Sequence, residues 1–313
     1  MTVLVPARCT SDLPGEFREH HVAEPKIDGS RYLFYIGSDP TGRHQGNALL
    51  SRHISKVDNL PVDKTGHVIG LKNPIPGLTG TVLDGEVFFK DFTYTQSILN
   101  CSTANAIERQ KDGGILKYHV FDCRVFRGED ISGLPLSKRR QVAEAVVKHI
   151  GLPNVSLVPQ WPHDRIQEMF NLIVAAGGEG VIVKDVRMGY GCSWAKMKKS
   201  YEISCFISGY KPGNGKYSDS IGAIAVSIYN DGKPIEIGFA SGFSDVVRAE
   251  MNKNRDKFLG RIVDVYAQEL SAGLRLRHPT FLRFRDDYAQ VDCTLVRAKE
   301  AFKQGAKSRR IRR

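Results

Sequence analysis

The stretch Glu24-Pro25-Lys26-Ile27-Asp28-Gly29-Ser30-Arg31 brings a lysine, a carboxylate and an arginine together on one short loop or strand end. The amine of Lys26 is a potential nucleophile, and a planar guanidinium such as that of Arg31 grips a phosphate group. Gly29 lies between them, where a residue without Cβ lets the backbone approach a ligand closely. The segment predicts a site for a phosphate-bearing ligand, with a solvated turn as the alternative interpretation of these residues alone.

The charge balance of the chain predicts a polyanionic partner. Its 313 residues include 45 Lys and Arg against 34 Asp and Glu, which gives a formal net charge of +11 at pH 7. Nucleic acid is the first partner that such a surplus indicates, and an anionic membrane surface is the second. The length accommodates two domains, each with its own hydrophobic core.

The cysteines and the apolar segments indicate where the protein works. The six cysteines are scattered and form no Cys-x-x-Cys pair, so they favour a reducing compartment over a zinc ribbon or a disulfide framework. No run approaches about 18 apolar residues, and the N-terminus has no signal-peptide pattern, so we expect no membrane span and no secretion.

A carboxylate pair lies on the strand predicted at Thr81–Phe89. Asp84 and Glu86 are two residues apart, so their side chains face the same side of the strand. Two carboxylates there repel each other unless a cation lies between them, and such oxygen ligands are those that Mg²⁺ prefers. A turn at Asp84-Gly85 is the alternative.

Two later segments add charged groups to strand ends. The β-branched run after Glu179 predicts a buried strand, so Glu179 and Lys184 should lie at the rim of a cleft. Lys196 and Lys198 would face the same way on a strand, and two ammonium groups so close suit a phosphate-bearing ligand. The alternative for the lysine pair is a solvated edge strand.

Two more predicted strands end on residues with a chemical use. The strand at Ala48–Ser51 delivers Arg52, and the strand that begins at Leu116 ends on Phe121. An aromatic ring stacks on any nucleobase. A position in the hydrophobic core is the alternative for Phe121.

Two helices follow as scaffold. Ser137 is expected to cap the first, which Gly151 ends, and Asp164 is expected to cap the second, which ends at Gly177. Neither helix is assigned any chemistry.

The pattern changes near Ser200. Gly-rich turns separate short strand-like runs, and one helix is predicted at Asp245–Phe258, which fits an OB-fold barrel. We therefore predict an α+β chain with one domain at residues 1–200 and an OB-fold β-barrel domain at residues 201–313, which ends in the basic tail Lys307–Arg313. The predicted strands of this second domain are Cys205–Tyr210, Ile221–Tyr229, Ile235–Ala240, Arg261–Ala267 and Phe281–Phe284.

Taken in chain order, these segments resemble the motifs of the covalent nucleotidyltransferases, and within them the ATP-dependent DNA ligases of minimal phage and viral type. The lysine segment is similar to motif I, Ser51-Arg52 to motif Ia and Asp84-Gly85-Glu86 to motif III. Phe121 stands where motif IIIa has its aromatic residue. The remaining matches are Glu179–Lys184 to motif IV, Trp194–Lys198 to motif V and Arg277–Tyr288 to motif VI.

This resemblance implies a nucleotidyltransferase (adenylation) domain followed by the OB-fold domain, and a reaction in three steps. Lys26 attacks the α-phosphorus of ATP, AMP passes to the 5′-phosphate of a nick, and the 3′-hydroxyl displaces AMP. The implied cofactors are ATP and Mg²⁺, with Mn²⁺ as a substitute. The implied partner is nicked double-stranded DNA, bound by a monomer in the cytoplasm of a bacterial or phage-infected cell or at a site of viral DNA replication.

The resemblance also implies roles for individual residues. Glu24 would lie beside the exocyclic edge of adenine, Phe121 would stack on it, and Arg31 and Arg52 would lie near the ribose and the nick phosphate. The implied catalytic residues are Lys26, Asp28, Lys196 and Lys198, the other nucleotide contacts are Lys184 and Arg285, and the metal ligands are Glu86 and Glu179.

Tyr288 departs from the family pattern, in which motif VI ends Arg-x-Asp-Lys. Arg285 and Asp287 fit that pattern, but Tyr288 stands in the place of the lysine. In the family this segment orients the β,γ-phosphates of ATP, so the departure puts the rate of self-adenylylation in doubt. The alternatives are an RNA ligase, a capping guanylyltransferase that carries GMP, and a non-catalytic OB-fold protein that binds nucleic acid.

Overall fold

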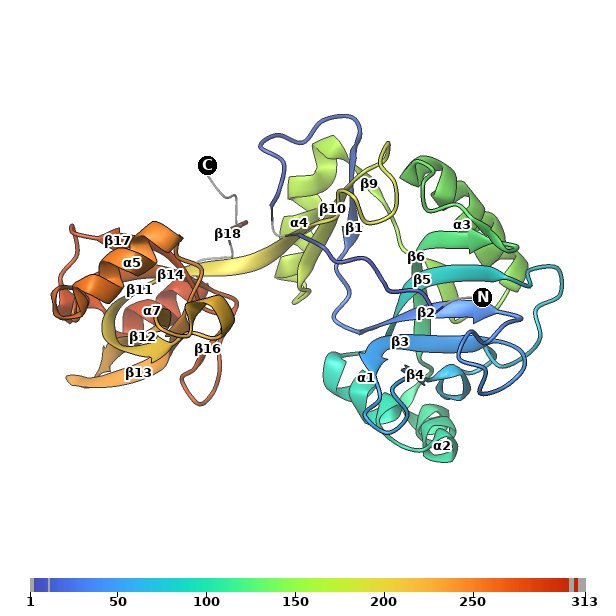
Figure 1. Ribbon diagram of the computed structural model, residues 1–313, viewed down its shortest axis with the longest axis horizontal. Helices are drawn as coiled ribbons and strands as arrows, with labels where there is room; N and C mark the ends of the chain where they lie inside the picture. Colours follow the sequence, from blue (N-terminus) through green and yellow to red (C-terminus); the bar gives the residue numbers. More distant parts are fainter. Residues whose placement is uncertain (1–2, 11, 304–306, 309–313) are drawn as a thin grey trace. The chain divides into compact units, whose positions relative to one another are not determined.

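The computed structural model describes residues 3–10, 12–303 and 307–308. The chain divides into two compact units, the first ending at Met197 and the second beginning at Lys198. Figure 1 draws the helices and strands of both units, and each unit is described separately below.

The larger sheet of the first unit brings together the strand that follows the Lys26 loop and the strands predicted for motifs Ia, III and IIIa. β2 pairs antiparallel with both β3 and β5, and β5 pairs with β6. The predicted strands of this region are therefore confirmed, but their predicted ends at Arg52 and Phe121 are wrong, since β3 continues to Ile54 and β6 to Phe126. The order is β4 (Pro61–Asp63), β3 (Ala48–Ile54), β2 (Ser30–Ile36), β5 (Thr81–Phe88), β6 (Lys117–Phe126) and β7 (Glu129–Asp130), with β8 (Val155–Leu157) also paired to β6.

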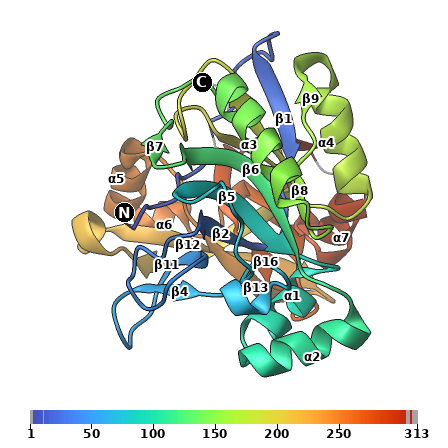
Figure 2. The ribbon, with the colours of Figure 1, turned by 90° about the vertical axis from the view of Figure 1, so that its right-hand side faces the viewer.

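Both faces of this sheet are buried, which explains the unbroken apolar run in β2. Tyr32, Phe34 and Ile36 belong to the main core, which α1 (Phe92–Leu99), α2 (Thr103–Gly113) and α3 (Leu136–Ile150) complete. Leu33 and Tyr35 point to the opposite face and join a smaller cluster there. Figure 2 looks onto this unit and shows α3 lying along β6.

A smaller sheet in the same unit carries the segment that precedes Lys26. β1 (His21–Pro25) runs antiparallel to β10 (Gly180–Asp185), and β9 (Trp161–Pro162) pairs with its other edge. α4 (Ile166–Ala175) covers this sheet, with Phe170 packed against Val181 and Val183.

The two predicted N-caps are wrong. α3 begins one residue before Ser137 with Pro135 as its N-cap, and α4 begins after a 3-10 turn, with Arg165 in the cap position. Neither N-cap residue forms a side-chain capping bond. Packing of the apolar faces of these helices against the sheets stabilises them instead. The predicted end of α3 at Gly151 is confirmed, and this residue adopts the left-handed conformation with φ 64°.

The second unit is a barrel of the five strands that the sequence predicted. β11 (Ala195–Pro212) pairs with β12 (Ile221–Asn230) and β14 (Ile262–Ala267), β12 pairs with β13 (Lys233–Ala240), and β14 pairs with β17 (Thr280–Arg285). A parallel bridge between Ser241 and Thr280 joins the end of β13 to β17 and closes the barrel.

Helices and short strands complete the second unit. The helix predicted at Asp245–Phe258 is broken at Asn254 into α5 (Asp245–Lys253) and α6 (Arg255–Phe258). α7 (Leu295–Lys303), which the sequence analysis did not predict, packs Leu295 and Ala298 into the barrel core. The short strands are β15 (Glu269–Leu270), β16 (Leu276–Arg277) and β18 (Lys307–Ser308), and the rest of the predicted basic tail, residues 309–313, lies outside the described residues.

Among the described residues, none of the helices has the length and apolar character that a membrane crossing requires.

Candidate active site

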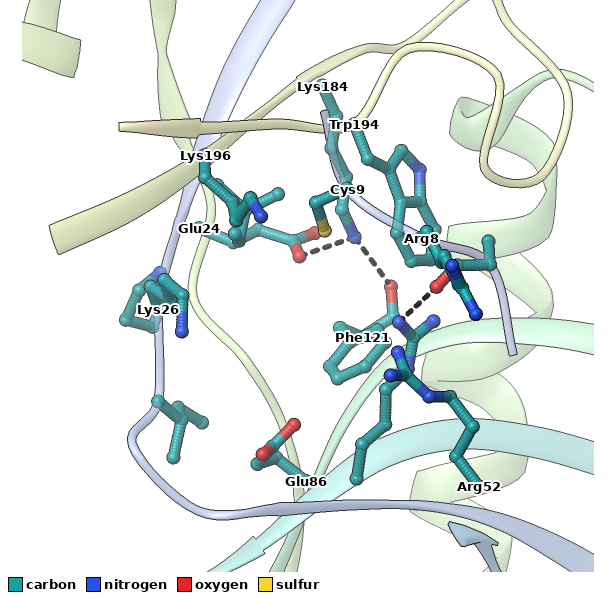
Figure 3. Close-up of a pocket in the computed structure, with 15 residues that line it drawn as sticks. Arg8, Cys9, Glu24, Lys26, Arg52, Glu86, Phe121, Lys184, Trp194 and Lys196 are labelled. Atoms are coloured by element: carbon teal, nitrogen blue, oxygen red, sulfur yellow. Dashed lines mark hydrogen bonds and ion pairs between the residues drawn. The ribbon is translucent and has the colours of Figure 1, made fainter. Parts of the chain in front are cut away.

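A cavity of about 450 Å³ lies within the first unit, between the small sheet and the large one. Strands β1 and β10 form one wall, and β2, β3, β5 and β6 contribute side chains to the other. Figure 3 shows Lys26 and Arg8 on opposite sides of it. Its lining residues are Ala7, Arg8, Cys9, Glu24, Pro25, Lys26, Ile27, Arg31, Arg52, Glu86, Phe121, Ile182, Lys184, Trp194 and Lys196.

Lys26 is the first residue after β1, and its backbone is fixed to the neighbouring strand. Its N–H donates to the carbonyl of Gly180 at 2.9 Å. Its ammonium forms an ion pair and hydrogen bond with Glu179, which directly precedes β10. The side chains are 20% and 15% exposed, so the amine lies at the edge of the cavity with a carboxylate beside it.

Gly29 is required by the close approach of this loop to β5. A Cβ at this position would lie 2.4 Å from the carbonyl oxygen of Val87 and 2.9 Å from Cγ of Glu86. Because no side chain fits there, the Lys26 loop can rest directly on the strand that carries Glu86.

Glu86 enters the cavity from β5, within electrostatic range of Lys26 and Glu179. Burial raises the pKa of this carboxyl to about 8, and the neighbouring cations of Lys26 and Arg31 only partly oppose that shift. Glu86 has no hydrogen-bond or ion-pair partner among the described residues. A carboxylate that is half-buried, poorly neutralised and close to a second one fits a site for a hard dication.

Glu24 and Lys184 form a buried ion pair in the same cavity. Nζ of Lys184 lies 2.6 Å from the carboxylate of Glu24, and the side chains are 1% and 3% exposed. Gln160 Nε2 donates to the other oxygen of Glu24 at 2.7 Å, and Arg140 lies 3.4 Å from it. The structure thus brings Lys184 into the site but pairs it with Glu24.

Arg31 is held by a comparable set of contacts. Its guanidinium binds Asp84 through two hydrogen bonds of 2.9 and 2.5 Å, and it donates to the carbonyl of Ala7 at 2.5 Å. The hydroxyl of Tyr190 also donates to Asp84. Asp84 therefore orients Arg31, while Glu86, two residues further along β5, lines the cavity.

Two aromatic rings form a shelf in the cavity. Phe121 and Trp194 meet edge to face with their centroids 5.8 Å apart. The guanidinium of Arg31 lies 5.1 Å from the Phe121 ring, and the ammonium of Lys184 lies 4.1 Å from that of Trp194. Rings with cations over them suit a ligand that combines an aromatic base with negative charge.

The other predicted site residues divide into two groups. Lys196 and Arg52 line the cavity. Asp28 is exposed, lies outside that lining and has no contact with the Lys26 ammonium among the described atoms. Lys198 and Arg285 belong to the second unit, where Lys198 continues β11 and Arg285 binds Asp287 at 2.9 and 2.7 Å.

Sequence reasoning missed several lining residues. Arg8 and Cys9 come from the N-terminal segment. This segment is held in place by a β-bridge between Thr10 and Ala195 and by the hydrogen bond from Arg31 to the carbonyl of Ala7. No periodicity or motif marked that segment. Trp194 carried a detectable signal, because it stands two residues before Lys196 in the Trp-x-Lys-x-Lys pattern.

Comparison with known proteins agrees with this geometry. Residues 7–200 match a family model described as the ATP-dependent DNA ligase domain, and residues 212–285 match a DNA ligase OB-like domain. The α+β prediction, a nucleotidyltransferase domain followed by an OB-fold domain, is confirmed.

Curated relatives include DNA ligases of two archaea. The chain is 26% identical over 318 residues to that of Archaeoglobus fulgidus, covering 90% of this chain and 55% of the relative. It is 24% identical over 299 residues to that of Haloarcula marismortui, covering 84% and 51%. The chain thus spans about half the length of the curated relatives it matches.

Solved structures support the fold. A structure from a study of Lig E DNA ligases, described as DNA binding with a minimal scaffold, superposes with a TM-score of 0.62 at 16% identity, covering 90% of this chain and all of that one. A second structure, Pmar-Lig_PreS3, gives a TM-score of 0.60 at 24% identity, covering 85% of this chain and 63% of its own.

Proposed function

Since this chain belongs to the family of ATP-dependent DNA ligase domains, we propose that it joins a 3′-hydroxyl to a 5′-phosphate at a nick in duplex DNA. ATP is consumed through a covalent Lys26–AMP intermediate. The observation that carries the proposal is the position of the Lys26 amine, which is held beside Glu179 at the edge of a cationic cavity with an aromatic shelf.

In the first step the amine of Lys26 attacks the α-phosphorus of ATP. A nitrogen–phosphorus bond forms, and the bond to the leaving pyrophosphate breaks. The amine has to lose a proton before it attacks, and the carboxylate of Glu179 is the acceptor within hydrogen-bond reach. Lys196 and Arg8 add positive charge to the cavity wall, where the phosphates accumulate negative charge.

Glu86 and Glu179 are the residues that would hold Mg²⁺. When bound, the ion neutralises charge that develops on the phosphate oxygens. Support comes from the donor set, since two carboxylates flank Lys26 and one of them, Glu86, lacks a partner among the described residues. Mn²⁺, with the same preference for oxygen ligands, is expected to substitute.

The base of ATP is proposed to lie against Phe121 and Trp194. Glu24 lies in the same cavity and is oriented by Lys184, Gln160 and Arg140, so its carboxylate is fixed before the nucleotide arrives. A fixed acceptor of this kind suits the exocyclic amine of adenine, which donates, better than the carbonyl of guanine, which accepts.

The second and third steps take place on DNA. AMP passes from Lys26 to the 5′-phosphate of the nick, and the 3′-hydroxyl then displaces AMP to form the phosphodiester. Arg52 extends from the nucleotide cavity into a neighbouring one lined by Ser51, His53 and Lys64, which supports a role for this polar surface in holding the DNA backbone. Asp28 is proposed to act on the 3′-hydroxyl side, and we expect the protein to work as a monomer.

The test is a step-resolved sealing assay on a nicked duplex. Lys26→Arg keeps the positive charge but removes the nucleophilic amine. We expect the wild-type protein to seal the nick with ATP, and Lys26→Arg to fail with ATP yet retain sealing of a duplex whose 5′-end is already adenylylated. Equal sealing by both proteins with ATP would contradict the proposal.

A further inference from the structure

Tyr288 contacts two arginine side chains on the surface of the second unit. The guanidinium of Arg285 lies 4.6 Å from the centroid of its ring, and that of Arg297 lies 5.4 Å from it. Arg297 also donates to the Tyr288 hydroxyl at 2.5 Å. One residue from β17 and one from α7 are thus brought to the same aromatic side chain, which lies between them in the sequence.

Tyr288 is a rigid support for this pair. It is partly buried and packs against the hydrophobic core of the barrel. Arg297 has a second anchor, since its guanidinium lies 3.0 Å from the carboxylate of Asp292. The side chain of Arg297 is 53% exposed, yet it is restricted by the hydroxyl and ring of Tyr288 and by Asp292. Little conformational entropy therefore remains to be lost when Arg297 binds an anion.

The acidic groups closest to the two guanidinium groups are exposed and easily replaced. Asp287, which binds Arg285, is 73% exposed, and Asp292 is 38% exposed. Exposed ion pairs contribute little free energy, so a phosphate dianion can displace these carboxylates. Arg285 also lies 3.6 Å from the fully buried carboxylate of Asp264, a longer contact than the 2.6 Å between Arg283 and the same carboxylate.

We propose that Arg297, positioned by Tyr288, is a phosphate-binding residue that acts with Arg285 and supplies the cation absent at position 288. Two guanidinium groups on one ring suit a single phosphate group. That phosphate belongs either to the polyphosphate of ATP or to the DNA backbone, and both sources have the same chemistry. This inference rests on the proposed ligase function, from which both ligands follow.

The test uses Arg297→Ala and separates the two sources. One arm measures the rate of self-adenylylation with ATP and no DNA, and the other measures sealing of a pre-adenylylated nick without ATP. Because a charge-assisted contact is lost, the rate should decrease about tenfold in the assay whose ligand, ATP or DNA, supplies this phosphate. Tyr288→Phe, which keeps the ring but loses the hydroxyl, should give a smaller decrease in the same arm.

Two controls make the test specific. Arg275→Ala removes an arginine that is also exposed and ion-paired, at 2.5 Å to Glu236, but that does not contact Tyr288; both rates should stay at the wild-type level. Tyr288→Lys in the Arg297→Ala background restores a cation at the position where the family has one. It should recover most of the lost rate, which a purely structural role of Arg297 would not allow.

The outcomes distinguish this inference from the proposed function. Wild-type rates in both arms for Arg297→Ala would overturn the inference and leave the ligase assignment intact. Absence of activity in the wild-type protein would overturn the proposed function instead. In that case binding by the wild type and by Arg297→Ala decides, through the affinity for ATP and through the salt dependence of nicked-duplex binding, whose slope falls by about one unit when one phosphate contact is lost. An unchanged affinity for ATP together with an unchanged slope would refute the inference.

Discussion

Removing one partner of the Glu24–Lys184 pair should destabilise the first unit strongly. Glu24→Gln leaves the ammonium of Lys184, which is 1% exposed, without its counter-charge. Breaking a buried ion pair from one side costs about 3–5 kcal/mol. For a unit of this size, that loss corresponds to a decrease in melting temperature of roughly 6–20 °C.

The assay is urea unfolding followed by tryptophan fluorescence. Both tryptophans, Trp161 and Trp194, belong to the first unit, so the signal reports on that unit. Lys184→Met should also destabilise, because it leaves the carboxylate of Glu24 with only Gln160 and Arg140. The double variant should be more stable than the sum of the single effects predicts, since neither charge is then left unpaired.

A matched surface pair provides the control. Glu108 and Lys111 form an ion pair of 2.6 Å in α2 with side chains that are 68% and 62% exposed. Glu108→Gln should therefore change the free energy of unfolding by less than about 1 kcal/mol. If Glu24→Gln is as mild as Glu108→Gln, or if the two single effects simply add, the buried pair does not have the energetic role argued here.

Three further predictions follow from the site. Burial raises the pKa of the Glu86 carboxyl to about 8, so its contribution to the free energy of unfolding is present below the unfolded-state pKa of 4.5 and is lost as the pH rises through 8. Glu86→Gln should flatten this decrease of the free energy of unfolding with pH, measured by urea unfolding. In the wild type, the Mg²⁺ concentration for half-maximal adenylylation should fall as the pH rises through 8. Gly29→Ala should lower self-adenylylation by more than about tenfold, because its Cβ would meet the Val87 carbonyl, while Gly133→Ala, whose Cβ has nothing within 4 Å, should keep the wild-type rate. Binding of nicked duplex should weaken steeply with added salt and show no sequence preference in competition assays, and a flat salt response would count against backbone recognition.

The strands that carry the site could be predicted from the sequence, because period-two and β-branched patterns determine which residues face the core. Asp84 and Glu86 illustrate the limit of that reasoning. Their spacing predicted a shared face, but it could not show that Asp84 is used by Arg31 while Glu86 remains facing the cavity. Pairing of charges depends on contacts between strands that are distant in the sequence.

Helix starts and the N-terminal segment were less predictable. Ser137 and Asp164 are good capping residues, yet tertiary packing begins both helices elsewhere. Arg8 reaches the cavity through an irregular segment whose path depends on hydrogen bonds to β2 and β11. The arrangement of Arg297 on Tyr288 likewise depends on α7, for which no helix was predicted.

The most direct test of the central claim is to incubate the wild-type protein with ATP and Mg²⁺ and to locate any covalent adduct by peptide mass mapping. We predict one AMP per chain, attached to Lys26, with release of pyrophosphate and loss of the adduct when nicked DNA is added. An adduct on another residue, or no adduct in a folded protein that binds ATP, would contradict it.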